Sequence, residues 1–117
     1  MNSNDAVAAL AALAQETRLA VFRLLVQAGE EGIVAGDIAQ QLAVPAATLS
    51  FHLKELAHAG LIAGTQAGRN VIYRAAYAAM DELIAYLTDN CCQGGGACLP
   101  KTAAAATGAK RRRLAKI

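Results

Sequence analysis

The sequence predicts a mainly α-helical domain with one small β-hairpin. Of the 117 residues, 29 are alanine, the strongest helix former, and only 4% are aromatic. Apolar residues make up 56% of the chain, which excludes a natively unfolded protein. Near residue 60 the helical pattern gives way to β-favourable runs on either side of a turn. The length allows one compact domain, and a core this small favours pairing with a second copy.

Apolar residues at helical spacing predict five helices. They cover residues 5–14, 18–28, 36–42, 45–59 and 77–90. Gly29 follows the second helix and is the residue type that ends helices in a left-handed cap. Pro45 suits the first turn of a helix and not its interior. The short third helix, the tight turn and the longer fourth helix together predict a helix-turn-helix.

A hairpin directly follows the helix-turn-helix. Residues 61–66 and 71–74 are β-favourable runs, and residues 67–70 form a turn-like connection between them. The predicted fold is therefore a winged helix-turn-helix. We divide the chain into a DNA-binding and dimerisation domain over residues 1–90 and a segment over residues 91–117 that carries the cysteines and a flexible basic tail.

Charge is distributed unevenly along the chain. Residues 1–100 carry five basic and nine acidic side chains, whereas residues 101–117 carry six basic side chains and no acidic one. Because the body is weakly acidic, any binding of DNA has to depend on a few well-placed groups. No apolar stretch reaches the roughly 18 residues of a membrane span, and the N-terminus lacks the basic start of a secretory signal. We therefore expect a cytoplasmic protein outside the membrane.

The helix over residues 45–59 has one face suited to DNA. Leu49, Leu53 and Leu56 recur at helical spacing and are expected to face the core. A major groove admits one α-helix, and side chains near the N-terminal end of that helix reach the base edges. The predicted DNA-contacting residues are Ala47, Thr48, Ser50, Phe51 and Lys54 on this helix and Arg69 at the hairpin tip.

Two of these assignments have alternatives, and His52 on the same helix also has two interpretations. Phe51 packs on thymine methyl groups or on sugar, or else it folds back against the first helix. Arg69 enters a minor groove or grips a phosphate, or else it is a solvated turn arginine. His52 lies at the edge of the buried stripe, where we expect a partly buried histidine and not a metal ligand.

All three cysteines fall within eight residues, at Cys91, Cys92 and Cys98. Adjacent cysteines rarely form a disulfide with each other, and the cytosol keeps thiols reduced. Three glycines between Cys92 and Cys98 allow the chain to fold back on itself. Structural zinc normally takes four ligands, whereas three thiolates match the trigonal pyramid of As(III) or Sb(III). The alternative is an exposed cysteine cluster without a ligand.

Several runs of residues resemble the ArsR/SmtB family of winged-helix repressors. They include the sequence from Thr48 to Ile62, which contains the Ser-x-His-Leu-x-x-Leu-x-x-x-Gly-Leu pattern, and the resemblance covers about residues 7–90. It implies a homodimeric repressor of double-stranded operator DNA, with the first and last helices at the dimer interface. The residues at Thr48, Ser50, Phe51 and Lys54 would read the operator, and the wing around Arg69 would hold its flank.

The chain departs from the family pattern in two places. Residues 34–38 lack the Cys-x-Cys metal box that many members carry, and Phe51 stands where a basic residue or histidine is commonest. The cluster of Cys91, Cys92 and Cys98 resembles instead the arsenite-responsive branch, in which the site follows the last helix. The resemblance thus implies an arsenic-resistance repressor released by As(III) or Sb(III). We do not expect an enzyme, because the sequence shows no C-x-x-C beside a βαβ unit and no acid-base pair near the thiols. Alternatives are a sensor of Cd(II), Pb(II), organoarsenicals or thiol oxidation, and, from other classes, an arsenic carrier or a thiol redox enzyme.

Overall fold

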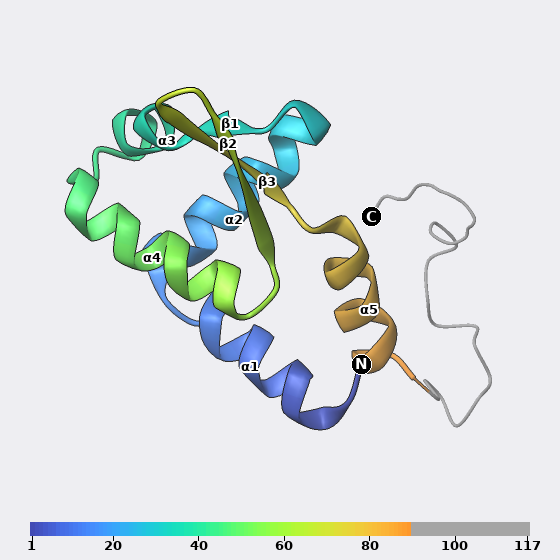
Figure 1. The fold of residues 1–117 in the computed structure, drawn as a ribbon. Coiled ribbons are helices and arrows are strands. Elements are labelled where there is room, and N and C mark those ends of the chain that lie inside the picture. Colours follow the sequence, from blue (N-terminus) through green and yellow to red (C-terminus); the bar gives the residue numbers. More distant parts are fainter. Residues whose placement is uncertain (90–117) are drawn as a thin grey trace. The chain divides into compact units, whose positions relative to one another are not determined.

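The computed structural model describes residues 1–89, and it confirms the winged helix-turn-helix prediction (Figure 1). The described residues form five α-helices and one three-stranded antiparallel sheet, whose strand order is β1-β3-β2. The elements are α1 (Ser3–Leu13), α2 (Glu16–Ala28), the 3₁₀ helix η1 (Gly29–Glu31), β1 (Ile33–Val34), α3 (Ala35–Leu42), α4 (Ala46–His58), β2 (Ile62–Ala67), β3 (Asn70–Ala75) and α5 (Tyr77–Leu87).

The chain divides into two units, Met1–Tyr86 and Leu87–Ile117. The first unit holds every element up to β3 and all of α5 except its last residue. The predicted boundary after residue 90 lies outside the described residues and stays a prediction. Helix α5 was expected to reach residue 90, but it ends at Leu87, so the predicted helix was three residues too long.

The core is built around the leucines of α4. Leu49, Leu53 and Leu56 are all buried, as the apolar spacing predicted. They meet fully buried side chains from other elements, among them Leu25 of α2 and Ile38 of α3. Burying a leucine side chain stabilises a fold by about 1.5–3 kcal/mol, so this stripe fixes which face of α4 points inward.

Side-chain caps set the boundary between the first two helices. The side-chain oxygen of Asn2 accepts a hydrogen bond from the Asp5 backbone N–H at 2.8 Å, so α1 begins two residues earlier than the sequence predicted. Gln15 caps α2 in the same way, accepting from the Arg18 N–H at 2.9 Å. These caps satisfy backbone donors that a helix start leaves unpaired.

The side chain of Arg18 ties three segments together. Its Nε donates to the carbonyl oxygen of Ala12 in α1 at 2.6 Å. Its Nη1 lies 3.4 Å from Nδ1 of His52 in α4. Because a guanidinium has no acceptor, Nδ1 accepts in this contact. A half-buried cation in α2 thus links the end of α1 to the middle of α4.

The sheet contains one strand that the sequence did not predict. Strand β1 is two residues long and pairs with β3, with Ile33 opposite Tyr73. A two-residue strand is too short to show a period of two, and it forms because β3 supplies a hydrogen-bonding edge.

At the end of α2, Gly29 adopts φ +80° and ψ −162°. Its positive φ agrees with the predicted helix stop, but its ψ shows that it is not the left-handed cap that was expected.

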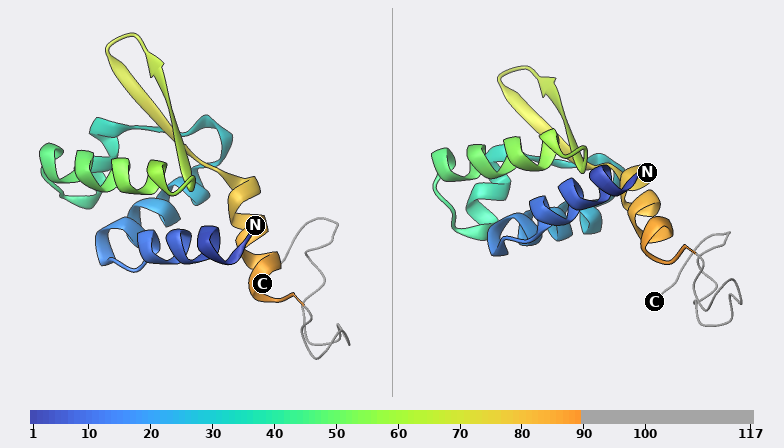
Figure 2. Two further views of the ribbon diagram at one scale, coloured as in Figure 1. Left: turned by 60° about the horizontal axis from the view of Figure 1, so that its bottom comes forward. Right: turned by 90° about the horizontal axis from the view of Figure 1, so that it is seen from below.

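The wing is a tight hairpin of β2 and β3. Ala67 pairs with Asn70, so the turn consists of Gly68 and Arg69 alone and is shorter than predicted. Arg74 anchors this hairpin to the body through its Nε, which donates to the carbonyl oxygen of Glu30 at 2.8 Å. Its Nη1 donates to Thr65 Oγ1 at 3.2 Å, a contact within the hairpin. The wing is therefore held at its base, while its tip extends away from the helices (Figure 2).

Within residues 1–89, no helix has both the length and the apolar character that crossing a bilayer requires.

Replacing Gly32 with alanine is expected to destabilise the fold by about 2–4 kcal/mol. Gly32 has φ +72°, and a Cβ there would lie 2.6 Å from the Tyr73 carbonyl oxygen. The matched control is Gly36→Ala in α3, where a Cβ meets nothing within 4 Å. Urea unfolding should leave the control equal to wild type or up to about 1 kcal/mol more stable. Equal stability of the two variants would contradict the close approach of Gly32 to Tyr73 of β3.

Replacing Arg18 with alanine is expected to lower the free energy of unfolding by about 1–2 kcal/mol, because the Ala12 carbonyl and His52 both lose a charged donor. The control is Arg23→Ala, since Arg23 is an exposed arginine of the same helix. Exposed substitutions of this kind usually change stability by less than about 0.5 kcal/mol. The measurement is urea denaturation followed by circular dichroism, and identical midpoints for both variants would contradict the role given to Arg18.

Candidate nucleic-acid interface

The turn between α3 and α4 is short and its geometry is well defined. Ala43 caps α3 in the left-handed region, with φ 54° and ψ 45°. Pro45 is the N-cap residue of α4, with an extended ψ of 144°, which agrees with the predicted helix start. Alanine tolerates the left-handed region less well than glycine does, so the packing of the two helices holds this turn.

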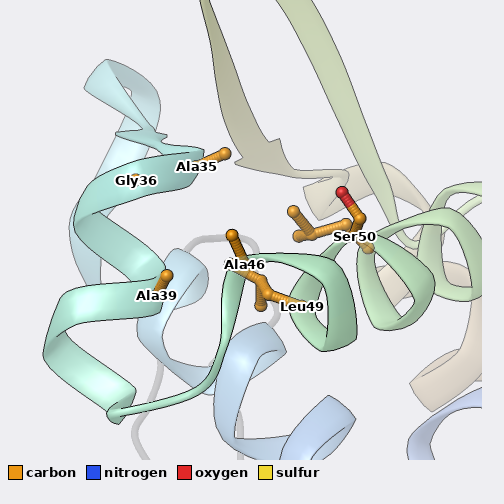
Figure 3. A pocket seen from close by; sticks show the side chains of 7 residues that line it. Ala35, Gly36, Ala39, Ala46, Leu49 and Ser50 are labelled. Carbon is orange, nitrogen blue, oxygen red and sulfur yellow. The ribbon is translucent and has the colours of Figure 1, made fainter.

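A small hollow separates the two helices of the helix-turn-helix (Figure 3). Ala35, Gly36 and Ala39 line it from α3, and Ala46, Leu49, Ser50 and Leu53 line it from α4. Its volume is about 100 Å³, well below the roughly 300–1,000 Å³ of typical small-molecule sites. The lining residues are mostly small, so we assign the hollow to close helix packing and not to a ligand.

The outer face of α4 carries every helical residue that the sequence predicted to contact DNA. Ala47, Thr48, Ser50, Phe51 and Lys54 are all exposed. Phe51 has 56% of its surface exposed, which favours the outward interpretation over the one in which it folds back against α1. The same helix thus presents a polar and aromatic face outward while its leucines fill the core.

Arg69 occupies the tip of the wing and is exposed. Helix α4 packs against β2, so the wing and the outer face of α4 belong to neighbouring elements of one unit. In both views of Figure 2, α4 lies between the wing and α1. A surface that offers a helix and an adjacent hairpin with an arginine tip has the shape that a groove and its flanking backbone require.

His52 is the buried polar side chain of α4, with 8% of its surface exposed. Its ring meets the Phe51 ring edge-on, with centroids 5.6 Å apart and an interplanar angle of 63°. Its Nδ1 has Arg18 as a polar partner, and the side chain is more deeply buried than the partial burial that the sequence predicted. From the buried side of α4, His52 contacts the exposed Phe51 ring on the outer face.

Arg18 is the functional neighbour that sequence reasoning missed. It lies in the first turn of α2, where the helix dipole disfavours a cation. An arginine in such a position needs a partner elsewhere in the fold, and this was the available signal. The partner itself could not be read from the sequence, because Arg18 and His52 are 34 positions apart.

The predicted thiol site lies outside the described residues. Cys91, Cys92 and Cys98 all follow residue 89. Over the part of the chain that is described, no group of three or more His, Cys, Asp or Glu side chains is placed to hold a metal ion.

Comparisons with known proteins agree with this geometry. Residues 13–65 match a family described as a helix-turn-helix domain, a span that contains α2, α3 and α4. None of the curated proteins matches the sequence.

Solved structures resemble the chain over most of its length. An ArsR-like transcriptional regulator from Rhodococcus sp. RHA1 has a TM-score of 0.64 and 28% identity, covering 72% of this chain and 76% of that one. HlyU from Vibrio cholerae has a TM-score of 0.61 and 26% identity, covering 80% of this chain and 100% of that one. A homodimeric winged helix-turn-helix DNA-binding domain from Mycobacterium bovis has a TM-score of 0.60 and 27% identity, covering 74% and 81%. The fold and the helix-turn-helix match together identify a winged helix-turn-helix domain, and the chain is similar to solved transcriptional regulators of the ArsR-like type.

Proposed function

We propose that this protein is a transcriptional repressor that inserts α4 into the major groove of operator DNA. The observation that carries the proposal is the division of α4 into two faces. Leu49, Leu53 and Leu56 are buried, while Ser50 and Lys54 are exposed on the same helix. A helix anchored in this way keeps its register when its outer face contacts base edges and phosphates.

The acidic body makes individual cations important for this binding. Lys54 on α4 and Arg69 at the wing tip are exposed basic groups on neighbouring elements. Each neutralises a phosphate and releases counterions, which favours association at low salt. The six basic residues of 101–117 would add non-specific attraction to DNA.

The repressor would act as a homodimer. Helix α1 leaves Val7 and Leu10 exposed to 62% and 42%, and α5 leaves Tyr86 exposed to 38%. These are the helices that the family resemblance places at the dimer interface, and the Mycobacterium bovis neighbour is described as homodimeric. A two-fold dimer would present its α4 helices about 34–36 Å apart, one turn of DNA.

As(III) or Sb(III) would be the inducer, bound by Cys91, Cys92 and Cys98. The donor set supports this. The chain has three cysteines, and three thiolate sulfurs match the pyramidal geometry of As(III) or Sb(III) better than the four-ligand tetrahedral geometry of zinc. The cluster begins four residues after the end of α5, one of the two expected dimer helices. Binding there would change the angle between the two α4 helices. A coupling of about 1–3 kcal/mol, or 5–150-fold in operator affinity, suffices for release.

The variants Lys54→Ala and Arg69→Ala are expected to weaken duplex binding. Each should reduce the slope of log K against log salt by about one for every phosphate that a protomer no longer neutralises. Arg23→Ala serves as the control, because Arg23 is exposed on α2 and outside the proposed interface. Fluorescence anisotropy over a salt series provides the measurement. A slope unchanged by both Lys54→Ala and Arg69→Ala would reject this interface. No salt-dependent duplex binding by the wild type would instead favour a non-DNA arsenic carrier.

Cys91→Ser is expected to retain operator affinity and to lose release by arsenite. The same gel shift with Cd(II), Pb(II), an organoarsenical and a thiol oxidant tests the alternative signals. Arsenate serves as the control ligand, because it offers no comparable thiol-binding site. A Cys91→Ser protein that still leaves the operator when arsenite is added would show that the inducer binds elsewhere.

A further inference from the structure

We infer that Phe51 is a specificity-determining residue whose ring contacts the 5-methyl group of a thymine in the major groove. The inference rests on the proposed DNA-binding function and names the base feature that α4 selects. It concerns one side chain on the outer face of α4, and it predicts a thymine at a fixed position in each half-site of the operator.

Phe51 is exposed without a folding reason. More than half of its surface is open, at 56%, although burial of a phenylalanine stabilises a fold by about 1.5–3 kcal/mol. Its ring contact is the edge-on meeting with His52 at 5.6 Å. A large apolar group left in this position gains its stabilisation only when another molecule covers it.

The neighbours of Phe51 indicate that the other molecule is duplex DNA. Ala47 lies one turn before it and Lys54 lies one turn after it, and both are exposed. The short Ala47 side chain leaves room for the ring to enter a groove. The Lys54 ammonium favours a polyanion over an apolar protein surface. Phe51 is the sixth residue of α4, within the first two turns, from which recognition helices reach base edges.

The ring rests on a fixed support. His52 is 8% exposed, and its Nδ1 lies 3.4 Å from Nη1 of Arg18, whose Nε is bound to the Ala12 carbonyl oxygen. A phenylalanine has only two side-chain torsions, so it loses little conformational freedom when a base edge covers it. His52 and Arg18 are therefore positioning residues for the contact.

The chemistry of the ring selects thymine. A phenyl group neither donates nor accepts a conventional hydrogen bond, so it cannot read the polar edges of guanine, adenine or cytosine. Thymine is the base that offers an apolar group, its 5-methyl, in the major groove. Contact with deoxyribose would bury the ring equally well but would be indifferent to sequence, and the two contacts are separable by experiment.

The experiment removes only the methyl group. The wild-type protein first selects a duplex from a randomised pool, and a second copy of this duplex carries deoxyuridine in place of every thymidine. Wild type is expected to bind the deoxyuridine copy more weakly by about fourfold per Phe51–methyl contact, or about 15-fold for two half-sites. Phe51→Ala is expected to bind the two duplexes with nearly equal affinity, because it has no ring to contact the methyl group. A double-mutant cycle measures this from the dissociation constants of wild type and Phe51→Ala on the thymidine and deoxyuridine duplexes.

Lys54→Ala is the matched control, one turn along the same face. It is expected to weaken binding to both duplexes equally and so to keep the wild-type ratio between them. Circular dichroism should show Phe51→Ala to be folded, because the replaced ring is exposed.

Three results would overturn the inference while leaving the proposed function intact, two from duplex binding and one from sedimentation. One is a duplex that binds equally well with and without the methyl groups. The other is a Phe51→Ala protein that keeps the full wild-type loss, as expected if the ring contacts sugar. A change in dimer mass on sedimentation of Phe51→Ala would instead assign the ring to a protein interface. Failure of the wild type to select any duplex in a salt-dependent manner would reject the proposed function itself.

Discussion

Burial of the leucine stripe of α4 is the constraint on which the rest of this structure depends. Leu49, Leu53 and Leu56 pack into a core shared by the other elements, so the rotation of α4 about its axis is fixed. The other residues of α4, apart from the buried His52, then face outward. Because α4 packs against α1, α2, α3 and β2, its position also sets where the wing begins.

Two arginines complement this apolar packing with polar ties. Arg18 joins α1, α2 and α4, and Arg74 joins the wing to η1. Each donates to a backbone carbonyl oxygen, which neither core packing nor the helix and strand ladders satisfy. The apolar stripe thus determines the orientation of α4, and the arginines determine how the neighbouring segments meet it.

Charge and shape have separate roles in the proposed interface. The weakly acidic body does not favour general adhesion to nucleic acid, so its affinity would depend on exposed cations such as Lys54 and Arg69. Phosphate contacts position a protein without reading sequence. The side chains available for reading are small or polar, apart from Phe51, and this contrast makes the aromatic ring the most distinctive feature of the outer face.

The sequence by itself determined the helices, the helix-turn-helix, the hairpin and the outward face of α4, because each depends on the local periodicity of apolar residues and on turn residues such as Pro45 and Gly68. The tertiary structure alone decided the pairing of β1 with β3, the contact of Arg18 with His52 and the exposure of the Phe51 ring. These features depend on residues far apart in the chain. Ile33 pairs with Tyr73, 40 positions away, and no local sequence pattern predicts such a pairing. Side-chain caps at Asn2 and Gln15 moved the helix ends by a few residues, since one hydrogen bond outweighs a weak periodic signal there.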